Sequence, residues 1–228
     1  MLPELRWKTW HANLEVVRRG LVLYTFGNAS GFDQGENLVV IKPSGVDYDA
    51  LQPEDMVICD FQGNVVEGSL RPSSDLKTHL ALYKAFPQIG GIIHTHSKFA
   101  TAWAQAGRDI PPMGTTHADY FHGPVPCTRP LTDEEIDGDY VLNTGLAIIE
   151  RFEGVDPLAV PGVLVAGHAP FVWGTDPVDA AHNAVVLEAV AEMALMTVSL
   201  NPTSQVSQAL LDRHYYRKHG AAATYGQG

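Results

Sequence analysis

Two histidines separated by one residue carry the clearest chemical signal in the sequence. His94 and His96 stand in the stretch GIIHTHS, behind a short apolar run that is typical of a buried strand. Side chains of a strand alternate between its two faces, so both imidazoles are expected on the same face. Two imidazoles in that arrangement can bind one metal ion. Buried histidines that bond only to the backbone are equally common, so the interpretation needs further ligands.

Two other residues could complete a metal site. His168 lies in VLVAGHAPF, at the end of an apolar strand where a polar residue has little structural reason to be. Asp75 in PSSD stands at the start of a predicted helix, where an N-cap is the alternative role. Three imidazoles and one carboxylate suit zinc, with manganese or cobalt as substitutes. A catalytic metal of this kind would act as a Lewis acid on a developing enediolate.

Short turns rich in glycine and serine indicate an anion-binding site. Backbone amides, hydroxyls and one lysine are the groups that hold a phosphate monoester, although each turn alone is more often structural. The candidates in GNAS, KPSG and PSS are Asn28, Lys42, Ser44, Gly45, Ser73 and Ser74. Asp119 in TTHADY and Tyr225 in the tail are candidates for proton transfer.

Interleaved strands and helices must position these residues. The sequence predicts helices over 1–20, from Asp75 onward, and over 98–107, 144–154, 177–200 and 204–220. It predicts strands over 21–26, 37–42, 89–96 and 162–174, and a hairpin over 54–68. Because hairpins occur among the strands, a mixed or antiparallel sheet covered by helices is favoured over a strictly parallel one.

Length, charge and cysteine content restrict the class of protein. The 228 residues contain no long linker, which indicates one domain over residues 1–228. The net charge of −11 argues against nucleic-acid binding, and no window reaches the apolar length of a membrane span, so we expect no membrane partner. Cys59 and Cys127 are far apart and indicate reduced thiols in a cytoplasmic protein. Neither GxGxxG nor GxxxxGK[ST] occurs where the nucleotide-binding folds need it.

Seven motifs together show a family resemblance. GNAS, KPSGVDY, PSSD, HTHS, GTTHADYF, PCTR and HYYRKHGA resemble, in order, the class II sugar-phosphate aldolase and epimerase family, and within it the L-ribulose-5-phosphate 4-epimerases. The resemblance implies a three-layer α/β/α fold with a largely antiparallel central sheet. It also implies a homotetramer with active sites between subunits, a small sugar-phosphate substrate, and a divalent metal, usually Zn2+, with Mn2+ or Co2+ as substitutes.

The resemblance also assigns residues to roles. The metal ligands of the family fall on Asp75, His94, His96 and His168. The substrate-phosphate pocket falls on Asn28, Lys42, Ser44, Gly45, Ser73 and Ser74. Residues around the reacting carbons fall on Thr115, Asp119, His214 and Tyr225. Of these, Asp119 and Tyr225 are expected to reach in from a neighbouring subunit.

The implied reaction interconverts L-ribulose 5-phosphate and D-xylulose 5-phosphate in arabinose catabolism. C4 carries no acidic proton, so the C3–C4 bond is broken by retro-aldol cleavage. This leaves the enediolate of dihydroxyacetone and glycolaldehyde phosphate. The aldehyde rotates and is attacked on its other face, and Asp119 and Tyr225 would handle the proton of the C4 hydroxyl. The phosphate pocket keeps the fragment in place meanwhile.

Alternatives within the same fold differ at identifiable positions. Ketose-1-phosphate aldolases of the fuculose or rhamnulose type carry a glutamate in place of Asp75, and the shorter aspartate favours the epimerase. An adducin-like scaffold without catalysis should have lost the metal ligands, whereas all four are present. Dehydration of a thiosugar phosphate is disfavoured by TTHADY and the tail. Ala169 and Val141 depart from the family, which commonly has a glycine and an acidic residue there.

Overall fold

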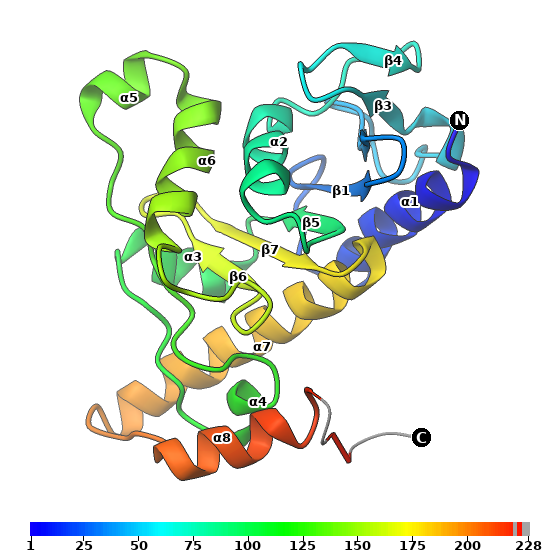
Figure 1. Ribbon diagram of the computed structural model, residues 1–228. Coiled ribbons are helices and arrows are strands. Elements are labelled where there is room, and N and C mark those ends of the chain that lie inside the picture. Colours follow the sequence, from blue (N-terminus) through cyan, green and yellow to red (C-terminus); the bar gives the residue numbers. More distant parts are fainter. Residues whose placement is uncertain (221–222, 225–228) are drawn as a thin grey trace.

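The centre of the molecule is a single antiparallel sheet. The computed structural model describes residues 1–220, 223 and 224, and within these the sheet has seven strands in the order β4-β3-β2-β1-β5-β7-β6 (Figure 1). Every neighbouring pair of strands is antiparallel, which confirms the expected sheet. The strands are β1 (Asn28–Asp33), β2 (Leu38–Ile41), β3 (Val57–Cys59), β4 (Val65–Glu67), β5 (Gly91–His94), β6 (Gly162–Leu164) and β7 (Pro170–Gly174).

Helices cover both faces of the sheet and complete three layers. One face carries α1 (Pro3–Arg18), α3 (Lys98–Gln105) and α7 (Pro177–Leu200), and the other carries α2 (Leu76–Ala85) and α6 (Tyr140–Arg151). Each face has its own hydrophobic core because side chains alternate along a strand. On β5, for example, Ile92 packs among residues of α2 and α6, while Ile93 packs among residues of α1, α3 and α7.

Three shorter helices and one 3-10 turn lie outside these layers. α4 (Thr115–Ala118) and α8 (Gln208–Tyr216) pack against each other at the end of the molecule remote from β3 and β4 (Figure 1). α5 (Asp133–Asp137) precedes α6 and packs on it, and η1 (Pro53–Asp55) lies against α1. The sequence analysis predicted neither α4 nor α5, because neither helix is long enough to show an apolar period.

Two predicted strands were wrong. Residues 21–26 form a turn, with Tyr24 at φ 52° and 91% exposed, so the strand begins only at Asn28. The stretch 162–174 is two strands, β6 and β7, joined by a turn that contains His168 and Gly167 at φ 72°. Both stretches are apolar enough for strands, but positive φ angles interrupt them. β5 also ends at His94, so His96 follows the strand instead of belonging to it.

The expectation that no segment has the length of a membrane span was wrong for α7. This helix of 24 residues is long and apolar enough by length and composition to cross a membrane. Its buried side chains pack against β5 and β7, and Asp176 caps its first turn by accepting hydrogen bonds from the backbone amides of Val178 and Asp179. Packing on the sheet accounts for the buried third of its apolar window, and a core helix of a soluble protein passes the same test of length and composition.

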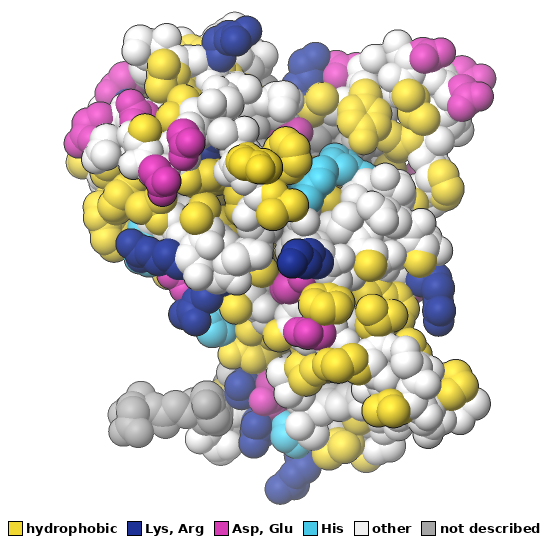
Figure 2. Space-filling model, turned by 180° about the vertical axis from the view of Figure 1, so that it is seen from behind, with side chains coloured by type: hydrophobic (Ala, Val, Ile, Leu, Met, Phe, Trp, Pro, Cys, Tyr) yellow, Lys and Arg dark blue, Asp and Glu magenta, His cyan; other side chains and the backbone are white. Residues whose placement is uncertain are grey.

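Charged side chains are dispersed over the visible surface. On the face shown in Figure 2, Lys and Arg side chains stand singly or in small groups among acidic and hydrophobic ones. With 15 basic against 26 acidic residues in the chain, this face offers no continuous basic stripe of the kind that binds nucleic acid.

Candidate active site

The predicted histidines converge. The candidate ligand atoms of His94, His96 and His168 all lie within 4.8 Å of one another, and the Nε2 atoms of His94 and His96 are 3.2 Å apart. They come from the end of β5, from the residues just after it, and from the β6–β7 turn. Because β5 and β7 are paired with His94 opposite Phe171, the sheet register brings the turn against the HTH stretch.

Burial keeps these imidazoles neutral, which is the form that binds metal. Desolvation lowers the pKa of His94, whose side chain is 2% exposed, and it also lowers the pKa of His96 and of His168. The Nδ1 atom of His94 donates to the carbonyl oxygen of Pro170 at 2.9 Å. That bond fixes the tautomer and leaves Nε2 with its lone pair free, as in many metal-binding histidines.

Asp75 stands at the N-cap position of α2, yet its side chain does not cap the helix. Its Oδ2 atom accepts a hydrogen bond from Asn28 Nδ2 at 2.7 Å and lies 4.0 Å from His94 Nε2. The Nδ2–H of Asn28 therefore points at Asp75, and its buried Oδ1 has no partner among the described residues. The capping interpretation of Asp75 is wrong for the side chain, which faces the imidazoles instead.

A cleft of about 360 Å³ joins the imidazoles to the predicted phosphate turns. Its lining contains the four candidate ligands and all six candidate phosphate residues, together with Thr25, Phe26, Gly27 and Pro43. Tertiary structure thus places ten predicted residues from five separate stretches around one cavity. The first turn of α2 opens into this cleft, and the free backbone amides at a helix N-terminus favour an anion.

Lys42 is the one cation among the residues that line this cleft, within the part of the chain that the structure describes. Its side chain is 1% exposed, and Nζ donates to the carbonyl oxygens of Val46 at 2.8 Å and Pro43 at 3.3 Å. The ammonium also lies 4.5 Å from the centre of the Tyr48 ring. Burial lowers the pKa of Lys42 to about 8, against the opposing attraction of Asp47. A bound phosphate would offset that desolvation.

Gly27 is required for the close approach of the 21–27 loop to the imidazoles. It has φ 82°, and a Cβ atom there would lie 2.7 Å from the carbonyl oxygen of His94. Any other residue would push the loop away from β5. The loop also carries Phe26, whose ring lies 5.9 Å from that of His96 and forms part of the cleft wall.

The remaining predicted residues gather elsewhere. Thr115 begins α4, Asp119 follows it, and His214 lies on α8, and none of the three lines the cleft. His214 Nδ1 donates to Asp119 Oδ1 at 2.9 Å, so this second cluster forms within one chain. Tyr225 lies outside the described residues. Asp119 and the candidate metal ligands of one chain therefore belong to two separate groups.

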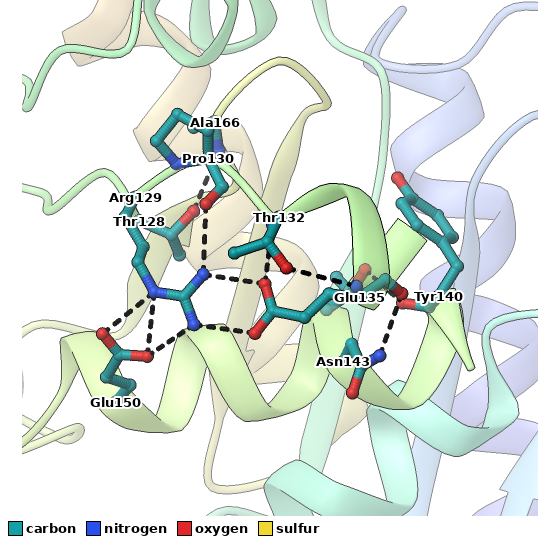
Figure 3. Close-up of polar contacts among 10 residues, drawn as sticks. Thr128, Arg129, Pro130, Thr132, Glu135, Tyr140, Asn143, Glu150 and Ala166 are labelled. Carbon is teal, nitrogen blue, oxygen red and sulfur yellow. Dashed lines mark hydrogen bonds and ion pairs between the residues drawn. The ribbon is translucent and has the colours of Figure 1, made fainter. Parts of the chain in front are cut away.

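Tyr140 has no role predicted from the sequence, yet it contacts the candidate metal ligand His168. Its hydroxyl lies 3.4 Å from His168 Nδ1, a long hydrogen bond that orients the ring. Tyr140 is the first residue of α6, and Figure 3 shows how this helix is held. Arg129 bonds to Glu135 of α5 and Glu150 of α6, tying both helices to the strand-like segment before Pro130 (Figure 3). Only a structure could reveal this role, since Tyr140 is far from His168 in sequence.

Glu188 of α7 is another residue that the sequence did not single out. Its two carboxylate oxygens accept hydrogen bonds from the backbone amides of Phe99 and Ala100, at 2.8 and 3.0 Å. These amides belong to the first turn of α3, directly after the HTHS stretch. Glu188 thereby fixes the backbone that follows His96 and satisfies amides that a helix start leaves unpaired.

The donor set fits a divalent metal. Three neutral imidazoles facing one another leave nitrogen lone pairs in close opposition, and a cation relieves that arrangement. Asp75 adds one negative charge nearby. Nitrogen and oxygen ligands of this kind are the ones that zinc, manganese and cobalt share.

Comparisons with known proteins identify the family and agree with the fold. The family model described as Class II Aldolase and Adducin N-terminal domain matches residues 8–195. The L-ribulose-5-phosphate 4-epimerases UlaF of two Salmonella strains, paratyphi C RKS4594 and choleraesuis SC-B67, are 53% identical to the chain over 227 residues, covering 99% of it and 100% of each relative.

A solved structure extends the comparison of folds. An L-fuculose 1-phosphate aldolase superposes with a TM-score of 0.79 at 24% identity, covering 94% of this chain and 95% of the aldolase. That likeness concerns the fold alone, whereas the identity to the epimerases extends over the whole sequence. The chain belongs to the class II aldolase and adducin N-terminal domain family, among the relatives of the L-ribulose-5-phosphate 4-epimerases.

Proposed function

We propose that this protein interconverts L-ribulose 5-phosphate and D-xylulose 5-phosphate by cleaving and re-forming the C3–C4 bond. The observation that carries the proposal is the cleft in which three imidazoles and Asp75 share one cavity with Lys42 and the serine turns. A ketopentose phosphate has its carbonyl and its phosphate at opposite ends, and this cavity offers a site for each. The identity to named epimerases supports the same reaction.

The cleft residues are proposed to bind and orient the substrate. Asp75, His94, His96 and His168 hold the metal, for which we propose Zn2+, and when bound it supplies Lewis-acid stabilisation of charge on the substrate oxygens. The phosphate lies at the first turn of α2, where Ser73, Ser74, Ser44, Gly45 and Lys42 offer hydroxyls, amides and a cation. Asn28 has two tasks, because Nδ2 holds Asp75 while Oδ1 remains free for a substrate hydroxyl.

Anchoring the phosphate has a direct mechanistic purpose. After cleavage, glycolaldehyde phosphate must turn its carbonyl over without leaving the site. Bonds to the phosphate hold one end of this fragment while the other rotates, which keeps the effective concentration of the aldehyde high. Asp119 and Tyr225 are proposed to handle the proton of the C4 hydroxyl on the two faces, and Thr115 and His214 to assist them.

The proposed active site needs a second copy of the chain. Asp119 and His214 bond to each other and do not line the cleft of their own chain. We therefore propose a homotetramer in which this cluster completes the cleft of a neighbour. The chain is proposed to act in the cytoplasm, where its sugar-phosphate substrates are found.

A coupled assay tests the reaction. Purified protein is incubated with L-ribulose 5-phosphate, with and without a chelator, and D-xylulose 5-phosphate is followed enzymatically. Chelator-sensitive product is expected. Release of dihydroxyacetone phosphate from a deoxyketose 1-phosphate, with no epimer formed, would instead move the function to an aldolase, leaving the metal cleft in place.

Hybrid oligomers test the shared site. His96→Asn impairs the cleft and Asp119→Asn impairs the other cluster, so each variant alone should retain only a small fraction of the activity. Mixed oligomers contain some sites that combine an intact cleft with an intact cluster, and activity should return in part. Absence of activity in oligomers shown by mass spectrometry to be mixed would count against sharing.

A further inference from the structure

Two cations beside Asp119 have no task in the proposed reaction. Arg217 reaches both carboxylate oxygens of Asp119, with Nη2 3.1 Å from Oδ1 and 3.0 Å from Oδ2, and Nε 3.3 Å from Oδ1. Lys218 places its Nζ atom 3.2 Å from Oδ2. Both residues follow the last turn of α8, so their backbone is fixed by the helix that packs on α4.

These contacts are more than a solvated surface pair. The side chain of Asp119 is 13% exposed and that of Lys218 is 14% exposed, whereas Arg217 is 40% exposed. Lys218 also lies 4.7 Å from the centre of the Tyr120 ring. A largely buried carboxylate that is held by two cations resists protonation more than an unpaired one does.

The other titratable groups around Asp119 are bases as well. From α8, His214 Nδ1 donates to Oδ1 at 2.9 Å, and from the residues that follow α8, His219 Nε2 donates to the backbone carbonyl oxygen of Asp119 at 2.9 Å. From α4, His117 donates away to the carbonyl oxygen of Gly123. From α7, the ring of His182 bonds to the hydroxyl of Tyr120. Among the described residues, no carboxylate other than Asp119 itself is bonded to these basic groups.

We propose that Arg217 and Lys218 are positioning residues that keep Asp119 ionised and fixed in direction, so that Asp119 begins the reaction as the proton acceptor. The inference rests on the proposed function. In the cleavage step the proton of the C4 hydroxyl passes to an Asp119 oxygen, and the electron pair of that O–H bond becomes the second bond of the aldehyde carbonyl. The C3–C4 electron pair remains on the three-carbon fragment. The proton returned on the other face must then come from a different group.

The balance of forces at Asp119 supports the assignment. Burial raises the pKa of Asp119, but the hydrogen bonds from Arg217, His214 and Lys218 outweigh it and bring the pKa below the usual value. Without Arg217 the desolvation would be less well compensated. The pKa would then rise, and Asp119 would become protonated at a higher pH than in the unaltered protein.

The experiment measures Asp119 directly in the full-length protein. The pKa of its carboxyl group is followed by 13C NMR with labelled aspartate, assigned by comparison with Asp119→Asn, in the unaltered protein and in Arg217→Gln. We expect Arg217→Gln to raise this pKa by about one unit. The acidic limb of the kcat/KM profile should move to higher pH by the same amount, since the base must be ionised. Arg217→Lys should restore part of the shift, and Lys218→Met should repeat it.

Arg213→Gln is the matched control. Arg213 lies exposed on α8 and has no ion pair with a residue of the described part of the chain, so neither readout should change. Metal content and thermal melting confirm that each variant is folded. In the Asp119→Asn background, Arg217→Gln should cause no further loss of turnover, because its effect passes through Asp119.

Two results would overturn the inference. One is an Asp119 pKa that stays unchanged in both Arg217→Gln and Lys218→Met. The other is a further tenfold loss when Arg217→Gln is added to Asp119→Asn, which would place Arg217 elsewhere in the reaction. The proposed function can fail separately. If the unaltered protein does not epimerise L-ribulose 5-phosphate but Arg217→Gln still raises the pKa of Asp119, the role of Arg217 in keeping Asp119 ionised stands and the proposed function is overturned.

Discussion

The imidazole cleft and the Asp119 cluster differ in how their charges are balanced. In the cleft, His94, His96 and His168 are held neutral by burial, and their nitrogens face one another around a common centre. In the cluster, the Asp119 carboxylate already accepts hydrogen bonds from His214, Arg217 and Lys218. The opposed imidazole nitrogens need a cation from outside the chain, whereas Asp119 is balanced by Arg217 and Lys218 of the chain itself.

This difference indicates that the cleft binds metal and substrate, whereas the Asp119 cluster transfers a proton. A site whose donors lack a partner is prepared to bind, and its geometry should respond to the metal and the phosphate. A site whose charges are compensated is prepared to act on a proton with fixed direction and a defined pKa. Variants should therefore separate the two regions, with cleft variants altering metal or substrate binding and cluster variants altering turnover alone.

The largest effect is expected from His96→Asn. Removing one imidazole should lower bound metal and activity together, and the loss should exceed the roughly 10–100-fold that follows from losing an outer-shell partner. Metal content is measured by emission spectroscopy beside the coupled assay. His182→Asn, on the exposed side of α7, serves as a histidine control outside the cleft. Full metal with full activity in His96→Asn would remove it from the ligand set.

Asp119→Asn tests the other side of the comparison. Loss of a proton-transfer group lowers turnover by roughly 10²–10⁴-fold, and the metal content and KM should stay nearly unchanged because the cleft is intact. Steady-state kinetics and metal analysis on the same preparation give both values. A fall in metal content would show that the two regions are not independent.

The phosphate end of the cleft should show its own pH dependence. Because burial brings the pKa of Lys42 to about 8, the ammonium loses its proton as the pH rises through 8 and phosphate binding weakens. KM should rise by up to about tenfold for each pH unit above that point, and kcat should change little. In Lys42→Met, KM should be high throughout and independent of pH in this range. A slope that persists in Lys42→Met would belong to another group.

A smaller effect is expected from Tyr140→Phe. The hydroxyl of Tyr140 lies 3.4 Å from His168 Nδ1, which is long for a hydrogen bond, so metal affinity should fall by about tenfold, the lower end for an outer-shell partner. Competition against a fluorescent chelator measures the affinity without the reaction. Tyr24→Phe, in the exposed turn, should leave it unchanged. Equal affinities for Tyr140→Phe and the unaltered protein would limit Tyr140 to packing.

The smallest effect is expected at the ion pairs that hold α5 and α6. The hydrogen bonds from Arg129 and the backbone amide of Thr132 keep the pKa of Glu135 at about 2, below its ordinary 4.5. A depressed carboxyl pKa stabilises the fold above pH 4.5, and this stabilisation is lost as the pH falls toward 2. The melting temperature should fall slightly over that window, and less so in Glu135→Gln. Asp137→Asn on the same helix provides the control. If the melting temperature depends on pH equally in both variants, the effect belongs to another group.

Local patterns were enough to predict much of the fold. The glycines that follow α1 and α3, the proline at the start of α7, and the Gly63 turn between β3 and β4 act within a few residues, so the sequence predicts these boundaries well. The strand predicted over 21–26 and the single strand over 162–174 were wrong, because apolar content does not reveal a residue with positive φ.

The candidate site was predicted unevenly for the same reason. His94, His96 and Asp75 belong to motifs whose residue types already indicate a metal site. Tyr140, Glu188 and Arg217 act through contacts between segments distant in sequence, and the residue types alone carry no such signal.

The residue types can be read without any structure: an acidic chain with a His-x-His pair, serine and glycine turns, and the ordered motifs of its family. Tertiary structure decided which of them meet. Antiparallel pairing of β5 with β7 brings His168 to His94, and the packing of α8 on α4 brings Arg217 to Asp119. Tertiary structure also keeps the imidazoles of the cleft apart from Asp119 and Arg217 within one chain. Such meetings depend on strand register and helix packing, which arise from the burial of whole faces and not from any local motif.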